Sequence, residues 1–352
     1  IFLTSYGTIR SDITYFMEQK FDYVVLDESQ IIKNPLSKIS KAVCLLKAEH
    51  RLCLSGTPLQ NNTYDLFAQM NFLNPNLLGN LEFFKKEFAL PIDKYNSVDH
   101  KNNLKKIVYP FILRRTKEMV AKDLPPKLES IIYCDMGDEQ RSIYEMYRLI
   151  YKKQILGQIE NVGIKNAQLS ILQGLMKLRQ ICDSPSILNE VDKYKPISIK
   201  TEELMSRLKE NILNHKVLIF SQFLGMLALI KENLDKEKIS YVYMDGQNNM
   251  NERTQSIQKF QNEETCKIFL ISLKTGGLGI NLTAADYVYI IDPWWNPAVE
   301  QQAIDRTHRI GQTKNVFAFK MICTDSVEDK IIVLQERKKK LIKDIISDEN
   351  SF

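Results

Sequence analysis

The sequence predicts an α/β protein with mostly parallel sheets. Eight short runs rich in β-branched and aromatic residues recur along its 352 residues. Most of these runs are continuously apolar rather than alternating, which is typical of strands buried on both faces of a parallel sheet. Helix-period patterns lie between them, as an α/β architecture requires. The predicted strands are Tyr23–Asp27, Leu52–Gly56, Ile131–Asp135, Lys216–Ser221, Tyr241–Asp245, Lys267–Ser272, Tyr287–Asp292 and Val316–Ile322.

Two helical stretches interrupt the strand pattern, at residues 64–122 and 139–182. Pro91 and Pro110 break the first stretch, and Leu124–Lys127 reads LPPK, in which the double proline continues neither element. The length also favours two domains. We therefore expect a first domain at residues 1–124, a second at 125–325 with its core at 201–315, and a C-terminal helix at 326–352.

The composition permits an anionic partner without requiring one. Lys and Arg number 48 against 43 Asp and Glu, a formal net charge of +5. The six cysteines form no CxxC pair, so we expect buried thiols in a reducing compartment. No apolar run is long enough for a membrane span, and we expect a soluble intracellular monomer without a membrane partner. Abundant Ile, Lys and Asn favour a compact bacterial or viral form with an AT-rich genome.

An acidic pair, Asp27 and Glu28, ends the first predicted strand. Ligands of open α/β sheets bind at the carboxyl ends of strands. There an aspartate can hold Mg²⁺ directly or through water, and the next carboxylate can orient or deprotonate a water in phosphoryl transfer. The alternative is a pair that only caps the following turn. The second strand ends similarly in a polar turn containing Ser55, Gly56 and Thr57, which alone is an ordinary turn.

The second half carries a stripe of polar and basic side chains at helical spacing. Asn296 is placed to cap a helix, and Gln302, Arg306 and Arg309 fall at i, i+4 and i+7 along it. That spacing predicts one shared helical face, on which two guanidinium groups and an amide suit phosphate oxygens. The alternative is a solvated face in which Asp305 neutralises an arginine.

A glycine-rich turn follows the strand at 267–272 and reads LKTGGLGINL. Its glycines permit close backbone approach, and its amides can cradle an anion. It is not a P-loop, because Lys274 and Thr275 precede the glycines instead of following them.

Together these residues resemble the Swi/Snf family of double-stranded-DNA-dependent ATPases, within the helicase-like superfamily two. The resemblance covers nearly the whole chain and implies two RecA-like lobes, helical protrusions and a C-terminal brace helix. The alternative for that last, basic helix is an ordinary surface helix. The matching segments, in order, are Leu3–Tyr6, Asp27–Gln30, Leu54–Asn61, Phe111–Lys117, Leu178–Pro185, Lys216–Phe223, Lys274–Asn281 and Gln302–Gln312.

The resemblance implies ATP and Mg²⁺ as cofactors and double-stranded DNA as partner. With it we expect a bacterial cytoplasmic, nucleoid-associated location, or a nuclear one if the source is eukaryotic. By it, Asp27 coordinates Mg²⁺, Glu28 activates water, and Arg306 and Arg309 act as arginine fingers. The further nucleotide-binding residues are Gln302 and Gly279. The residues that couple nucleotide state to lobe movement are Gln30, Ser55, Gly56, Thr57, Trp294 and Trp295. The DNA-binding residues are Thr4, Ser5, Tyr6, Ser221, Gln222, Lys274, Thr275, Gly276, Gly277 and Asn281.

The implied function is DNA-stimulated ATP hydrolysis that drives translocation and remodels a DNA-bound complex such as a nucleosome or RNA polymerase. Two features depart from the family pattern. The 352 residues contain no GxxxxGK[ST], so we expect the first lobe to be incomplete here and the Walker A loop to lie upstream of Ile1. Gln30 replaces a histidine in DESQ, and its amide forms hydrogen bonds but carries no charge.

Two other functions remain open at this point. One is a catalytically inactive DNA-binding or regulatory relative of the same fold. The other is an unrelated metal hydrolase using Asp27 and Glu28, although the sequence offers no nearby His or third carboxylate to complete such a site.

Overall fold

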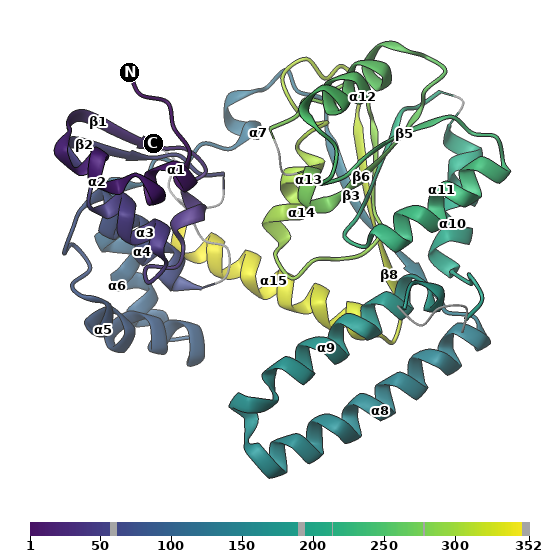
Figure 1. Cartoon of the computed structure of the whole chain (residues 1–352), viewed down its shortest axis with the longest axis horizontal. Coiled ribbons are helices and arrows are strands. Elements are labelled where there is room, and N and C mark those ends of the chain that lie inside the picture. Colours follow the sequence, from purple (N-terminus) through teal and green to yellow (C-terminus); the bar gives the residue numbers. More distant parts are fainter. Residues whose placement is uncertain (57–61, 189–193, 213, 277–278, 347–352) are drawn as a thin grey trace. The chain divides into compact units, whose positions relative to one another are not determined.

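The computed structural model describes residues 1–56, 62–188, 194–212, 214–276 and 279–346. By its contacts the chain divides into two compact units (Figure 1). The first unit holds residues 1–115 together with the C-terminal residues from 336 onward, and the second holds residues 116–335. The LPPK segment lies inside the second unit.

The first unit is built on a two-stranded parallel sheet. Strand β1 (Lys20–Leu26) pairs with β2 (Lys47–Cys53). One face of the sheet packs on a small core that includes Leu26, Ile32 and Phe72. The side chains of Tyr23, Val25 and Leu52 are 65%, 50% and 46% exposed. The helices around the sheet are α1 (Tyr6–Ser11), α2 (Ile13–Glu18), η1 (Ser29–Ile32) and α3 (Lys38–Cys44).

The predicted helical stretch at 64–122 forms several short helices. Helix α4 ends at Leu73, directly before Asn74 and Pro75, and Pro91 lies inside a π-helix. Their core includes Leu66, Phe84 and Leu104, and Ile345 of the C-terminal helix packs into it. The elements are α4 (Thr63–Leu73), α5 (Leu81–Phe84), η2 (Lys85–Lys94), α6 (Val98–Val108), η3 (Tyr109–Phe111) and, in the second unit, α7 (Lys117–Val120).

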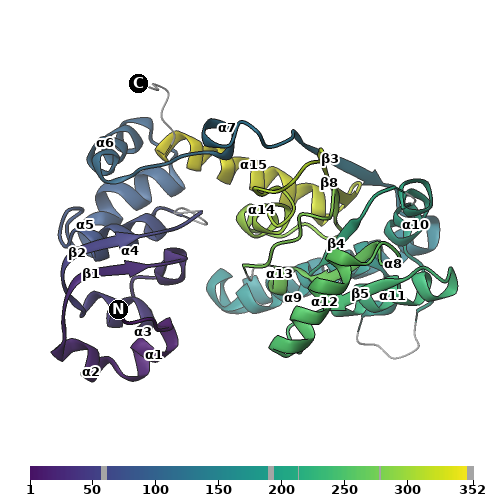
Figure 2. The same ribbon diagram turned by 90° about the horizontal axis from the view of Figure 1, so that it is seen from above.

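A six-stranded parallel sheet, in the order β3-β8-β7-β4-β6-β5, forms the centre of the second unit (Figure 2). Each predicted strand overlaps one of the eight observed strands, although β2 shares only Leu52 and Cys53 with the predicted Leu52–Gly56. Every strand pair is parallel, so the predicted α/β class is confirmed. The strands are β3 (Lys127–Cys134), β4 (Val217–Ser221), β5 (Tyr241–Met244), β6 (Ile268–Ser272), β7 (Tyr287–Ile290) and β8 (Val316–Cys323).

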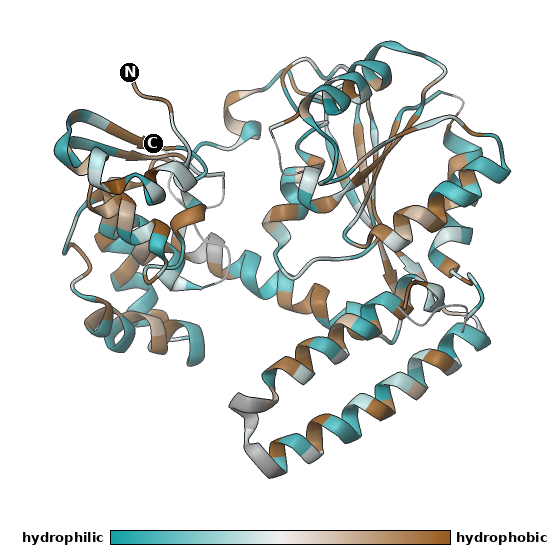
Figure 3. Cartoon of the chain, in the orientation of Figure 1, coloured by the Kyte–Doolittle hydropathy of each residue, from teal (hydrophilic) through white to brown (hydrophobic). Residues whose placement is uncertain are grey.

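Helices cover both faces of this sheet, and every residue of β4 and β6 is buried. Apolar residues concentrate along the central strands (Figure 3). Helices α8, α9, α10, α11 and the start of α15 contribute to one core, and α12, α13 and α14 to the other. These helices are α8 (Asp138–Val162), α9 (Ile164–Asp183), α10 (Ile199–Asn211), α11 (Leu224–Lys236), α12 (Met250–Asn262), α13 (Leu273–Gly276), α14 (Pro297–Ile304) and α15 (Val327–Ile346), with the short η4 (Pro185–Ile187) after α9.

The helical stretch predicted at 139–182 is two helices, α8 and α9, which pack as a hairpin (Figure 1). The chain reverses at Gly163, whose φ of 77° lies in the region that favours glycine. No helix among the described residues combines the length and apolar composition needed to cross a bilayer.

Candidate functional site

The acidic pair lies directly after β1. Asp27 is exposed, and its Oδ1 accepts a hydrogen bond from the backbone N–H of Glu28 at 2.9 Å. Glu28 has φ 49° and ψ 49°, a left-handed conformation that residues other than glycine rarely adopt. Such outliers cluster at functional sites, because the surrounding structure must compensate for their strain. The geometry therefore favours a functional role over a simple cap.

A hydrogen-bonded chain joins the acidic pair to the second polar turn. The Gln30 Nε2 donates to Glu28 Oε2, and Gln30 Oε1 accepts from Ser55 Oγ at 2.8 Å. Backbone pairing of Leu54 N–H with Leu26 C=O at 2.8 Å brings this turn beside the end of β1. The Gln30 amide can bridge Glu28 and Ser55 because it donates one hydrogen bond and accepts another at the same time. The coupling roles of Gln30 and Ser55 stay predictions.

The predicted DNA-binding residues near the N-terminus have local structural partners. The Tyr6 hydroxyl donates to the backbone carbonyl of Asp27 at 2.7 Å, and burial raises the pKa of that hydroxyl above its usual range. Ser5 caps α1 by accepting from the N–H of Thr8 at 3.1 Å. Thr4 and Ser5 are both exposed.

Of three further residues predicted to act in coupling or DNA binding, the structure describes Gly56 but not Thr57 or Gly277. Gly56 follows Ser55 in the described part of the chain, and a Cβ there would contact nothing within 4 Å. Thr57 and Gly277 lie outside the described residues.

The glycine-rich turn begins with α13, at the carboxyl end of β6. The hydroxyls of Ser272 and Thr275 lie 2.7 Å apart and are buried, whereas Lys274 is exposed. Gly276 is required by space: a Cβ there would lie 2.6 Å from a ring carbon of Phe220.

Helix α14 begins as predicted, with Pro297 first and Asn296 Oδ1 accepting from the N–H of Ala298 at 3.1 Å. Gln302 lies on this helix, half-buried. The prediction that Gln302, Arg306 and Arg309 share one helical face is wrong, because α14 ends at Ile304.

Tertiary contacts explain why the helix stops there. The backbone N–H of Leu282 donates to the carbonyl of Arg306 at 2.9 Å, so that carbonyl is engaged outside any helix. The Thr307 hydroxyl donates to the carbonyl of Ile304 at 2.7 Å. Residues 305–312, which we call the arginine turn, therefore leave the helix axis.

Both arginines of the arginine turn bind the glycine-rich turn instead. Arg306 is 4% exposed, and its Nε donates to Gly276 C=O at 3.0 Å. Arg309 is half-buried, and its Nη1 donates to Ile280 C=O at 3.3 Å. Two of the predicted residues nearby, Gly279 and Asn281, are exposed.

Ser221 and Gln222, the predicted DNA-binding residues at the end of β4, form hydrogen bonds with neighbouring buried groups. Ser221 is 1% exposed, and its Oγ accepts from Phe223 N–H at 3.0 Å. The N–H of Gln222 donates to both carboxylate oxygens of Asp292, at 3.1 and 3.0 Å. The Gln222 side-chain oxygen lies 3.5 Å from the guanidinium of Arg179.

Arg179 organises the two tryptophans, a role that was not predicted although Arg179 lies in the matching segment Leu178–Pro185. Its guanidinium carbon lies 5.3 Å from the Trp294 ring and 6.0 Å from the Trp295 ring, distances typical of cation–π contacts. Its Nη2 donates to Pro293 C=O at 2.7 Å. The only sequence signal was an arginine inside an otherwise apolar helical stretch.

A buried ionic cluster lies beside Arg179. The fully buried Lys200 ammonium binds Asp183 at 2.9 Å, Glu328 at 2.7 Å and the Ile291 carbonyl at 2.8 Å. Burial, reinforced by Asp183, raises the pKa of Glu328 to about 7 and that of Asp292 to about 8. Sequence reasoning missed this cluster, because one lysine at the start of an amphipathic helix gives no signal of burial.

The spacing of Cys182, Cys323 and Glu328 would suit a metal ion, since one ligand atom of each lies within 4.8 Å of the others. Lys200 already supplies the positive charge beside Glu328. A structural ion pair therefore accounts for this group.

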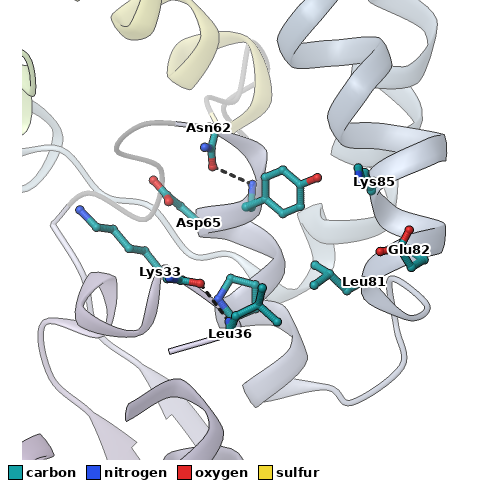
Figure 4. Close-up of a pocket in the computed structure, with 10 residues that line it drawn as sticks. Lys33, Leu36, Asn62, Asp65, Leu81, Glu82 and Lys85 are labelled. Carbon is teal, nitrogen blue, oxygen red and sulfur yellow. Dashed lines mark hydrogen bonds between the residues drawn. The ribbon is translucent and has the colours of Figure 1, made fainter. Parts of the chain in front are cut away.

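The first unit also contains an open cavity of about 430 Å³ (Figure 4). Lys33, Asp65 and Lys85 are among the residues that line it, and Asn62 accepts a hydrogen bond from Tyr64 N–H at its edge. Its lining includes none of the residues predicted from the sequence for the site.

The fold and the site define a helicase-like α/β protein: parallel sheets with an acidic pair at one strand end and two arginines on a glycine-rich turn at another. The chain belongs to the SNF2 family. The pattern described as the SNF2-related domain matches residues 1–187, and the helicase conserved C-terminal domain matches residues 199–311.

Individual relatives agree with this assignment. An uncharacterized ATP-dependent helicase of Mycoplasma genitalium is 38% identical over all of this chain, and the TATA-binding protein-associated factor MOT1 of Saccharomyces cerevisiae is 33% identical. The chain spans 33% and 22% of these two proteins. The Sulfolobus solfataricus SWI2/SNF2 ATPase core in complex with dsDNA matches 98% of this chain and 72% of its own, at 40% identity and a TM-score of 0.53.

Proposed function

We propose that the protein hydrolyses ATP in a reaction stimulated by double-stranded DNA, and that hydrolysis drives translocation along the duplex and remodelling of protein–DNA complexes. The observation that carries this proposal is the strained, hydrogen-bonded Glu28 beside the exposed Asp27 at the end of β1. Membership of a family whose members include ATP-dependent helicases supports it.

The acidic pair would serve the metal and the water. The exposed Asp27 carboxylate is a hard oxygen ligand, and such ligands fit Mg²⁺. Bound there, the ion would neutralise charge on the phosphates of ATP. Glu28 would orient the attacking water, with its carboxylate held by the Gln30 amide.

The arginines would supply positive charge to the transferring phosphate. An arginine finger accelerates this chemistry by about 10³- to 10⁵-fold, because it stabilises charge that develops in the transition state. The hydrogen bonds that the guanidinium groups of Arg306 and Arg309 donate to the carbonyls of Gly276 and Ile280 would fix these side chains in advance. Gln302 and Gly279 would complete the contacts with the nucleotide.

DNA phosphates would contact the exposed members of the predicted set, which include Thr4, Lys274 and Asn281. The hydroxyls of Ser221 and Thr275 are buried and engaged locally, so these residues would shape their turns and leave backbone groups to face the DNA. The dsDNA of the Sulfolobus structure and the name of the yeast relative support a DNA-bound protein as the target. A bacterial cytoplasmic location stays a prediction.

We also propose that this chain lacks the phosphate-cradling loop of the ATP site, because its 352 residues contain no GxxxxGK[ST]. The exposed face of the two-stranded sheet, with Tyr23, Val25 and Leu52, supports this, because parallel strands are normally covered on both faces. We expect the 352-residue chain to bind ATP weakly in a direct titration. Tight binding would contradict this part of the proposal.

The test compares ATP hydrolysis by the full-length protein with and without duplex DNA. We expect duplex DNA to stimulate turnover and Glu28→Gln to reduce it by at least about 100-fold while leaving DNA binding intact, since only the water-activating carboxylate is lost. Duplex binding without hydrolysis in the wild type would instead indicate an inactive DNA-binding relative.

A further inference from the structure

We propose that Lys117 and Pro125 form a clamp that sets the position of the arginine turn, with Lys117 as a positioning residue for Arg306 and Arg309. The catalytic consequence rests on the proposed ATP hydrolysis. The clamp lies in the segment of chain that leads from residues 1–115 to strand β3.

Lys117, the first residue of α7, makes two contacts with the arginine turn. Its Nζ lies 3.0 Å from Asp305 Oδ1 and donates to the backbone carbonyl of His308 at 2.7 Å. One ammonium group thus bridges two points of the turn that are three residues apart. The side chains of Lys117 and Asp305 are each about one third exposed, so we expect their ion pair to contribute little to the free energy of unfolding. Its proposed role is to position the turn.

Pro125 holds the turn at a third point. The His308 ring is 5% exposed, and its Nε2 lies 2.8 Å from the Pro125 carbonyl. A carbonyl only accepts, so Nε2 carries the proton, and Nδ1 has no hydrogen-bond partner among the described residues. The next residue, Pro126, accepts from the N–H of Val316 at 3.0 Å and so anchors the segment to the sheet.

The sequence positions of these contacts explain why they matter for the arginines. Asp305 directly precedes Arg306, and His308 directly precedes Arg309. The clamp therefore fixes the backbone one residue before each guanidinium-bearing side chain. The glycine-rich turn holds the arginine side chains themselves, through the carbonyls of Gly276 and Ile280.

The arginine turn is thus held from two directions. On one side its contacts come from residues 276–285. There the carbonyl of Gly276 accepts a hydrogen bond from Arg306, and the carbonyls of Thr283 and Ala285 accept from Gln312 Nε2. On the other side they come from Lys117 and Pro125, and more weakly from Lys127, whose Nζ lies 4.0 Å from Asp305 Oδ1. Loss of the second set would leave the turn free to shift, and misplacement of a catalytic group by about 1 Å can reduce turnover by about 100-fold.

The test substitutes Lys117 in the full-length protein. We expect Lys117→Ala to lower kcat for DNA-stimulated ATP hydrolysis about tenfold, with KM for ATP changed less than about twofold, because the arginines act on the transition state. Lys117→Arg should restore most of kcat, since a guanidinium can reach both acceptors. Lys122→Ala is the matched control, as Lys122 is an exposed lysine of the same segment with no hydrogen bond or ion pair to the turn among the described residues.

Hydrogen–deuterium exchange of peptides covering residues 305–312 gives a second measurement that does not depend on activity. We expect faster exchange in Lys117→Ala than in the wild type and in Lys122→Ala, with strands β4 and β6 unchanged. Equal exchange at 305–312 in all three proteins would overturn the clamp. A wild type that hydrolyses no ATP would defeat the proposed function, while the exchange comparison would still decide whether the clamp exists.

Discussion

Glu28 combines two features at the scale of a single residue: a left-handed backbone that costs roughly 1–2 kcal/mol and a side chain held by Gln30. The sequence predicted the acidic pair, because strand ends collect ligands in α/β sheets. It did not predict the left-handed backbone of Glu28, because a single φ value in a turn leaves no pattern in the sequence. The hydrogen bond between Ser55 and Gln30 joins two residues that the resemblance had grouped as coupling residues.

Gly276 provides a prediction at the same scale. We expect Gly276→Ala to destabilise the second unit by about 1–3 kcal/mol, because the new methyl group would lie 2.6 Å from the Phe220 ring, which is fully buried in the core. Chemical denaturation measures the change. Gly246→Ala is the control, because a Cβ there meets nothing within 4 Å and its stability should stay within about 0.5 kcal/mol of wild type. Equal effects of the two substitutions would contradict the packing argument.

At the scale of elements, the sequence predicted the strands of the six-stranded sheet well, but β2 and the helix ends poorly. Strands β4 and β6 were evident because burial on both faces demands an unbroken apolar run. The end of α14 was not, because a hydrogen bond from Leu282 to the carbonyl of Arg306 competes with the helical pattern. Hydrophobic periodicity reflects residues that are close in sequence, so it could not predict a hydrogen bond between Leu282 and Arg306, which are 24 positions apart.

Helix α10 carries the second prediction, through Lys200 near its start. We expect Lys200→Met to cost about 3–5 kcal/mol in unfolding free energy, because Asp183 and Glu328 would remain buried without their counter-charge. Lys209 also lies on α10, and Lys209→Met, which removes a half-exposed ion pair with Glu237 at the end of α11, should cost less than about 1 kcal/mol. A loss at Lys200 no larger than that at Lys209 would show that the cluster is not the anchor of this helix.

For the whole molecule, the buried carboxyl groups predict a pH-dependent stability. The pKa of Asp292 is raised from 3.8 to about 8 and that of Glu328 from 4.5 to about 7, chiefly by burial. Between about pH 4 and pH 8 the folded state therefore binds more protons than the unfolded state, and stability from these groups falls as pH rises. The contribution of these two carboxyl groups to the free energy of unfolding is fully present below about pH 4 and lost above about pH 8.

Urea denaturation of wild type and Asp292→Asn between pH 5 and pH 8.5 tests this. We expect the wild type to lose stability across this range, and Asp292→Asn to lose less, because an amide keeps an acceptor for the N–H of Gln222 but does not ionise. Identical slopes for the two proteins would show that Asp292 is ionised throughout. In that case Arg179, which lies 3.5 Å from Asp292, would outweigh burial in setting the charge of this cluster.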